Sequence, residues 1–182
     1  MSIGLKRGSV RLEPHDPAWD ISARETIGAM REILGADAAD IQHVGSTAIP
    51  GIVAKPIVDI AVGMRNPQAI RAHDGALAAR GIRYRKEEFG DQLLYVMGTD
   101  AARTHFIHVV PWNGEAWHNY IAFRDYLNAH PEDARLYSNL KQSLAEEYPE
   151  DREAYLAGKS ETIARILADA RKWAGSNTDR QE

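Results

Sequence analysis

The sequence contains no cysteine among its 182 residues. Disulfide bonds, thiolate catalysis and zinc sites with thiolate ligands are therefore excluded. Long apolar runs are also missing. Residues 1–13 lack the apolar stretch of a signal peptide, and no window approaches the roughly 20 apolar residues of a membrane helix. We therefore expect a cytoplasmic protein with no membrane partner.

Positive charge is not in excess either, because 22 Lys and Arg residues stand against 26 Asp and Glu residues, for a formal net charge of -4. Proteins that coat nucleic acid carry basic surfaces, so this balance argues against that role. It leaves open a small anionic ligand in a local pocket. The length and a hydrophobic content of 44% are typical of one globular domain and set no oligomeric state.

Helix signals recur along the chain. Asp16-Pro17 has the residue types of an N-cap and a first helical position, and apolar residues at helical spacing follow as far as Gly35. Asn66-Pro67 repeats the signature and predicts a helix that ends near Gly81. Beyond residue 112 the sequence predicts three helices, with breaks near residues 130–131 and near Pro149.

Short apolar segments between these helices predict strands. Residues 57–62 are almost all apolar and are bounded by Pro56 and Gly63, which predicts a buried central strand. The other expected strands are 10–12 at an edge, 41–44, 82–85, 93–97 and 105–110, with turns at 90–91 and 98–100.

This order of elements predicts an α/β or α+β fold with a mixed sheet and a C-terminal helical bundle. We expect a single domain over residues 1–174, with its core at about 8–112 and its helical part at about 113–174. Residues 175–182 are polar and predict a disordered tail.

The chemistry is concentrated in residues 43–60, His-Val-Gly-Ser-Thr-Ala-Ile-Pro-Gly-Ile-Val-Ala-Lys-Pro-Ile-Val-Asp-Ile. Gly45 allows a phosphate to approach the backbone, and Ser46 with Thr47 offers hydroxyl and amide donors. Lys55 can neutralise the same phosphate. Asp59 in a buried strand needs a partner. Spacing alone also fits a plain Gly-Ser turn and an aspartate that accepts hydrogen bonds from backbone amides.

This stretch resembles the signature of the GrpB family, also named UPF0157, in every element. The resemblance extends over about residues 10–170, although His15 stands where the family pattern leads us to expect tyrosine. The other segments that carry it are Pro14, Asp16, Pro17, Trp19, residues 105–110 and 123–127, Tyr155 and Lys159.

The resemblance implies a nucleotidyltransferase-like fold and a relation to a domain fused to dephospho-CoA kinase in some bacteria. In active members of that fold, Gly-Ser holds the nucleotide triphosphate. An Asp-x-Asp pair and a third carboxylate from a later strand hold Mg²⁺ for in-line displacement. Here Asp59 is followed two residues later by Ala61, so the second carboxylate is absent.

Histidines stand where the third carboxylate is expected. By the period of two, Phe106 and His108 share a strand face, which allows His108 to meet Asp59, whereas His105 faces the other way if the strand is regular there. An Asp59–His108 pair can bind a divalent metal such as Mg²⁺ or Mn²⁺, orient a general base, or form a structural pair. His43 and His105 are further candidate ligand-binding residues near the Gly-Ser loop.

Two cations complete the candidate site. Arg103 precedes the last strand and can contact an anion or be solvated. Lys159 lies on an apolar helix stripe with Tyr155 and Ile163, where it either binds a carboxylate or phosphate or buries only its stem.

The leading hypothesis is a protein that binds a nucleotide or a phosphorylated small molecule between sheet and helices. As an enzyme it would transfer a nucleotidyl or phosphoryl group, with Asp59 and His108 as catalytic residues. One alternative is a non-catalytic nucleotide-binding or chaperone-like module linked to coenzyme A metabolism. Another is a hydrolase or lyase that uses the Asp59–His108 pair.

Overall fold

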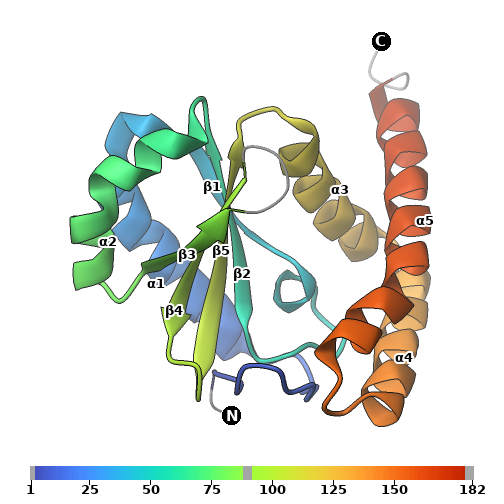
Figure 1. Cartoon of the computed structure of the whole chain (residues 1–182). Coiled ribbons are helices and arrows are strands. Elements are labelled where there is room, and N and C mark those ends of the chain that lie inside the picture. Colours follow the sequence, from blue (N-terminus) through green and yellow to red (C-terminus); the bar gives the residue numbers. More distant parts are fainter. Residues whose placement is uncertain (1–2, 88–91, 179–182) are drawn as a thin grey trace.

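The computed structural model describes residues 3–87 and 92–178, which form a mixed sheet with helices on both faces (Figure 1). The strands are β1 (Ala38–Val44), β2 (Val58–Met64), β3 (Arg83–Glu87), β4 (Leu93–Gly98) and β5 (Arg103–Pro111). Their order is β1-β2-β5-β4-β3. β2 and β5 are parallel, and the other neighbours are antiparallel.

Helices α1 (Pro17–Leu34) and α2 (Asp74–Ala79) cover one face, whereas α3 (Glu115–Ala129), α4 (Pro131–Glu147) and α5 (Arg152–Thr178) lie on the other side of the sheet (Figure 1). Short 3₁₀ turns occupy Gly35–Asp37, Ser46–Ala48 and Pro67–His73. The mixed α/β fold with a C-terminal helical part is confirmed. Over the described residues, no helix is long and apolar enough to cross a membrane.

α1 begins where its sequence signature predicts. The Asp16 carboxylate accepts a hydrogen bond from the Ala18 amide at 2.9 Å, Pro17 occupies the first turn, and Gly35 ends the helix with a φ of 52°. The buried face includes Trp19 and Met30, which pack against the apolar side chains of β2 and β5.

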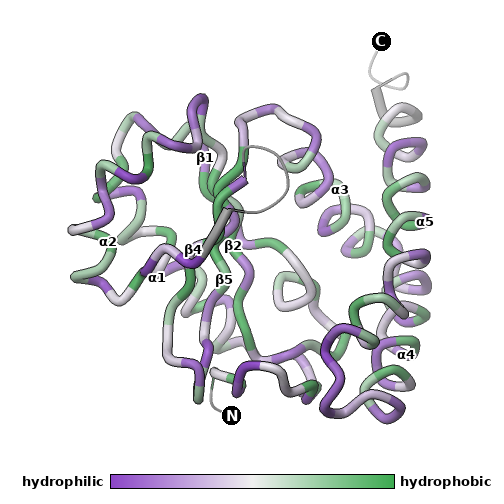
Figure 2. Tube along the Cα trace, viewed as in Figure 1, coloured by the Kyte–Doolittle hydropathy of each residue, from purple (hydrophilic) through white to green (hydrophobic). Residues whose placement is uncertain are grey.

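The C-terminal helices pack against the loop that follows β1 rather than against the sheet alone. Ile49 and Ile52 of that loop are buried with Tyr126, Tyr137 and Ile166 in a second core. α4 and α5 alternate between hydrophilic and hydrophobic residues, which is the pattern of helices with one buried stripe (Figure 2). The loop is therefore held between the two layers.

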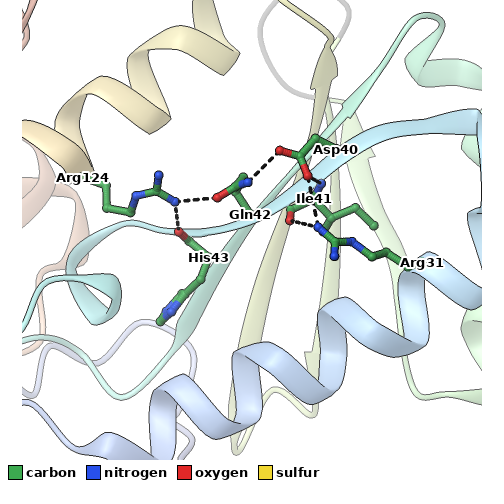
Figure 3. Close-up of polar contacts among 6 residues, drawn as sticks. All are labelled: Arg31, Asp40, Ile41, Gln42, His43 and Arg124. Carbon is green, nitrogen blue, oxygen red and sulfur yellow. Dashed lines mark hydrogen bonds and ion pairs between the residues drawn. The ribbon is translucent and has the colours of Figure 1, made fainter. Parts of the chain in front are cut away.

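β1 is an edge strand whose free backbone carbonyls are capped by arginines (Figure 3). Arg31 of α1 contacts the Ile41 carbonyl at 3.4 Å, and Arg124 of α3 donates to the His43 carbonyl at 2.9 Å. The Gln42 side chain links the two arginines through Asp40. This chain of contacts protects the edge from pairing with another strand and ties both helix layers to the strand that enters the site.

The structure differs from the sequence-based expectations in three places. Residues 10–12 form no strand, and the isolated bridges of the N-terminal segment lie outside them, at Leu5 and Glu13. The expected helix at 66–81 is a 3₁₀ turn followed by the short α2. α5 continues through Thr178, so residues 175–178 are helical where a disordered tail was expected. Residues 179–182 and the turn expected at 90–91 lie outside the described residues.

Candidate functional site

The loop after β1 turns sharply at Gly45, which has a φ of 70°. Val44 and Asp59 are register partners in β1 and β2, so the turn begins directly beside Asp59. A Cβ at position 45 would lie 2.8 Å from the Asp59 Oδ2 atom. Glycine is therefore required both for the backbone conformation and for the approach of the loop to the carboxylate.

Asp59 and His108 meet across β2 and β5. The register places Ala61 opposite His108 and Asp59 opposite Phe106, so these side chains share one face of the sheet. The His108 Nε2 atom lies 3.2 Å from the Asp59 Oδ1 atom, and the Tyr120 ring stacks near the imidazole at 5.0 Å between centroids. The expected face-sharing and the Asp59–His108 contact are both present.

A cavity of about 210 Å³ opens beside this pair, between the sheet and the first turns of α5. Its lining residues come from the loop, the strands and helices α4 and α5. Its lining comprises Ser46, Thr47, Lys55, Ile57, Asp59, Leu94, Phe106, His108, Lys141, Arg152, Tyr155, Leu156 and Lys159. Most of the site residues expected from the sequence are therefore brought together.

The cavity is lined by four cations and one carboxylate. Lys55 and Lys159 lie on the Tyr155 ring, with their Nζ atoms 4.8 and 4.7 Å from its centroid. Lys141 donates to the Val53 carbonyl and is almost fully buried. In the part of the chain that the structure describes, none of Lys55, Lys141, Arg152 and Lys159 forms an ion pair with a carboxylate.

Burial and neighbouring positive charges lower the pKa values of the three lysines. Burial, the largest cause, and the neighbouring Lys159 and Arg152 charges lower the pKa of Lys55 to about 8. Burial lowers the pKa of Lys159 to about 8 against the opposing effect of Asp59. Burial lowers the pKa of Lys141 well below its ordinary value, and Lys159 and Lys55 add to the effect. Among the described residues, the cavity therefore holds more cationic side chains than carboxylates.

Lys141 and Arg152 were not expected from the sequence as site residues. A signal for Lys141 existed, because it lies four residues after Tyr137 and three before Leu144, on the buried stripe of α4. Arg152 is the first residue of α5 and had no such signal. Its position depends on how α5 docks near the loop.

Two histidines expected to bind ligand lie elsewhere. His105 points to the α1 face, where its Nε2 atom is 3.2 Å from the Ser22 hydroxyl and 3.3 Å from that of Thr26. His43 contacts Asp20 at 3.4 Å and the Thr47 hydroxyl at 2.9 Å. Alternation along β1 and β5 turns both side chains away from the cavity, so neither lines it. His43 reaches the site only through Thr47.

Arg103 lies outside the cavity that holds Asp59. It borders an adjoining cavity of about 470 Å³ and forms an ion pair with Asp100.

The side chains present do not fit the usual metal centre of the fold. Asp59 is the one carboxylate of the cavity, and Ala61 supplies no second ligand. No group of three or more His, Asp or Glu side chains in the described ranges is arranged to hold a metal ion. A two-carboxylate Mg²⁺ site is therefore not formed by these residues.

The fold is nucleotidyltransferase-like. The Cid1 poly(U) polymerase superposes with a TM-score of 0.54 at 15% identity, over 81% of this chain and 49% of that chain. The conserved protein GrpB from Enterococcus faecalis superposes with a TM-score of 0.84 at 27% identity, over 90% of this chain and 99% of that chain.

The chain belongs to the GrpB family, whose model, described as GrpB protein, matches residues 9–169. It is 41% identical to UPF0157 protein PA4798 of Pseudomonas aeruginosa, over 88% of this chain and 67% of that protein. It is 34% identical to the glutamate-rich protein GrpB of Alkalihalophilus pseudofirmus, over 91% of this chain and 98% of that protein. A dephospho-CoA kinase of Mycolicibacterium paratuberculosis is 28% identical over 94% of this chain but only 48% of its own length.

Gly45 and Gly51 provide a matched test of the approach to Asp59, because both have positive φ and only Gly45 has a neighbour at the Cβ position. We expect Gly51→Ala to lower the free energy of unfolding by about 1 kcal/mol, through backbone strain alone. Gly45→Ala should cost about 2–4 kcal/mol because overpacking against Asp59 is added. Urea unfolding of both variants measures the difference, and equal losses would contradict the assigned contact.

His105 should make stability depend on pH. Burial lowers its pKa to about 4 in the folded chain, from an ordinary 6.5. As pH falls below 6.5, His105 binds a proton in the unfolded chain but stays neutral in the folded chain. The free energy of unfolding therefore decreases until about pH 4, by about 3 kcal/mol in total. His105→Gln should flatten unfolding free energies measured between pH 7 and pH 4.5. His118→Gln, at an exposed histidine, is the control. If the unfolding free energy of His105→Gln depends on pH as steeply as that of the wild-type chain, His105 is not the cause of the pH dependence.

Proposed function

We propose that this chain binds a nucleotide or a phosphorylated small molecule in the cavity beside Asp59, with a phosphate placed against Ser46 and the lysines. The observation that carries the proposal is a set of four cations around a single carboxylate. Among the described residues, Lys55, Lys141, Arg152 and Lys159 form no ion pair with a carboxylate. A chain with a net charge of -4 has concentrated positive charge where the Gly45-Ser46 turn presents its donors.

The electrostatics favour a multiply charged anion. Each buried ammonium group has lost water and gained a like-charged neighbour, which is why the pKa values of Lys55 and Lys159 are lowered to about 8. A phosphate between them offsets both effects, since an opposite charge stabilises the protonated amines. Anion binding is therefore coupled to proton uptake near pH 8.

Fold and relatives support a nucleotide among the phosphorylated ligands. The Cid1 polymerase structures hold MgGTP or Mg 3′-dATP, and at 15% identity they share only the fold with this chain. The similar dephospho-CoA kinase makes coenzyme A metabolism a setting for the non-catalytic alternative, in which the chain binds its ligand as an accessory module.

A transfer reaction is the second candidate, and the Asp59–His108 contact at 3.2 Å favours it. His108 would accept the proton of an attacking hydroxyl while Asp59 orients the ring. The new phosphorus–oxygen bond forms as the bond to the leaving group breaks, and the leaving group departs with the electron pair. The lysines would stabilise the charge on the transferred group, and this step uses no metal ion.

Calorimetric titration with ATP, GTP, CTP, UTP and inorganic phosphate in EDTA tests the binding proposal. At least one of these anions should bind, and its affinity should fall as pH rises from 7 to 9, because the pKa values of Lys55 and Lys159 are about 8. Lys159→Gln should weaken binding about 10-fold, the equivalent of about 1.4 kcal/mol. Lys172→Gln, on an exposed turn of the same helix, should leave affinity unchanged.

The outcomes also separate the two candidates. Binding that persists in EDTA and survives Asp59→Asn supports a binding module. Turnover of a bound triphosphate that is lost in Asp59→Asn and in His108→Gln supports a transferase. If none of the five anions binds at pH 7, the proposed function is wrong.

A further inference from the structure

A second cavity of about 470 Å³ adjoins the first on the side of the N-terminal segment. The two cavities share Lys55, Ile57, Leu94, Phe106 and Arg152 in their linings. They are therefore neighbouring compartments along one face of the sheet. The apolar side chains of Ile57, Leu94 and Phe106 border both compartments.

Arg103 is the buried cation of the second compartment. The residue is 6% exposed, and its Nη2 atom contacts the Asp100 carboxylate. Its Nε atom is buried and has no hydrogen-bond partner. A buried N–H donor without an acceptor is energetically unfavourable, so an acceptor placed at the Nε atom would stabilise Arg103. The cationic carbon lies 5.9 Å from the Phe106 centroid, which places the guanidinium at the border with the first compartment.

Backbone contacts hold Arg103 in this position. The Leu5 amide donates to the Arg103 carbonyl at 3.0 Å, and the Arg103 amide donates to the Leu5 carbonyl at 2.8 Å. The same N-terminal segment brings Lys6 and Arg7 into the cavity lining. The compartment is thus built from a strand and a segment distant from it in sequence.

The charges that face Arg103 have both signs. Lys6, Arg7, Lys55, Arg85 and Arg152 line the compartment with it, against Glu150, Asp151 and Glu153. The Asp151 carboxylate accepts hydrogen bonds from the Glu153 and Ala154 amides at 3.1 and 3.0 Å, so it caps α5. Glu150 and Glu153 are exposed. The buried charge of the compartment is therefore the positive charge of Arg103.

We propose that the second compartment is an anion subsite centred on Arg103, and that the ligand carries two anionic groups joined by an apolar segment. This inference rests on the proposed function, because the first anion is the phosphate near Ser46 and the lysines. The second anion, a phosphate or a carboxylate, accepts from the Arg103 Nε atom. The apolar segment lies along Ile57, Leu94 and Phe106. Lys55 and Arg152 border both subsites and face both charges.

Ligand pairs that differ only in the second anion test this arrangement. The probes are n-alkyl monophosphates and α,ω-alkanediol bisphosphates of the same chain length, titrated calorimetrically in EDTA at pH 7. At one or more chain lengths the bisphosphate should bind the wild-type chain at least 10-fold more tightly than its monophosphate. An ω-carboxyalkyl monophosphate of the same chain length, which carries one phosphate and one carboxylate, distinguishes the two possible second anions.

Variants test whether Arg103 causes the gain in affinity from the second anion. Arg103→Gln should abolish the gain from the second anion and leave monophosphate affinity within about twofold, whereas Lys159→Gln should weaken both ligands. Arg103→Lys keeps a positive charge for Asp100 without the Nε donor, so it should retain a folded chain and a reduced gain. Arg83→Gln, at an exposed arginine that lines neither cavity, is the control.

Each negative result of these titrations has a different interpretation. If monophosphates bind and bisphosphates bind no more tightly, the subsite is wrong and the proposed function stands. If neither ligand nor any nucleotide binds, the proposed function fails, and the subsite fails with it. A gain that survives in folded Arg103→Gln and Arg103→Lys would overturn the assignment to Arg103.

Discussion

The close approach of the Gly45 backbone to the Asp59 side chain is the constraint on which the site depends. The missing side chain at Gly45 lets β1 turn away beside Asp59, which sends the loop toward the C-terminal helices. Ile49 and Ile52 then bury themselves among those helices, so the loop also fixes how the helical layer docks. The position of the lysines over the carboxylate follows from this packing.

The candidate site lies on a nucleotidyltransferase-like fold, and its cavity holds one carboxylate and four cationic side chains. Ala61 is fully buried among apolar neighbours such as Val44 and Val110, where a second carboxylate would be costly without a metal. The opposite register position holds His108, which contacts Asp59. Positive charge comes from Lys55 of the loop and from Lys141 and Lys159 of the helices, whose ammonium groups are flexible donors with titratable charge.

Much of the fold was predictable because its signals are local. The Asp16-Pro17 cap, the apolar run of β2 and the alternation that places His108 with Asp59 each act within a few residues. His105 lies away from the cavity for the same local reason, since alternation turns its side chain to the α1 face, where it contacts Ser22 and Thr26. Residues brought in by docking, above all Arg152, have no local signal.

Lys141 differs from Arg152, because its sequence position carries a local signal, whereas its contacts in the site depend on the fold. Its position on the stripe with Tyr137 and Leu144 places it in the core of α4, where an isolated ammonium group is unfavourable. The Val53 carbonyl gives it one acceptor, and Tyr137 gives it an aromatic face at 4.7 Å. Neither contact supplies a negative charge. An anion bound in the cavity, as proposed above, would supply the negative charge that these two contacts lack.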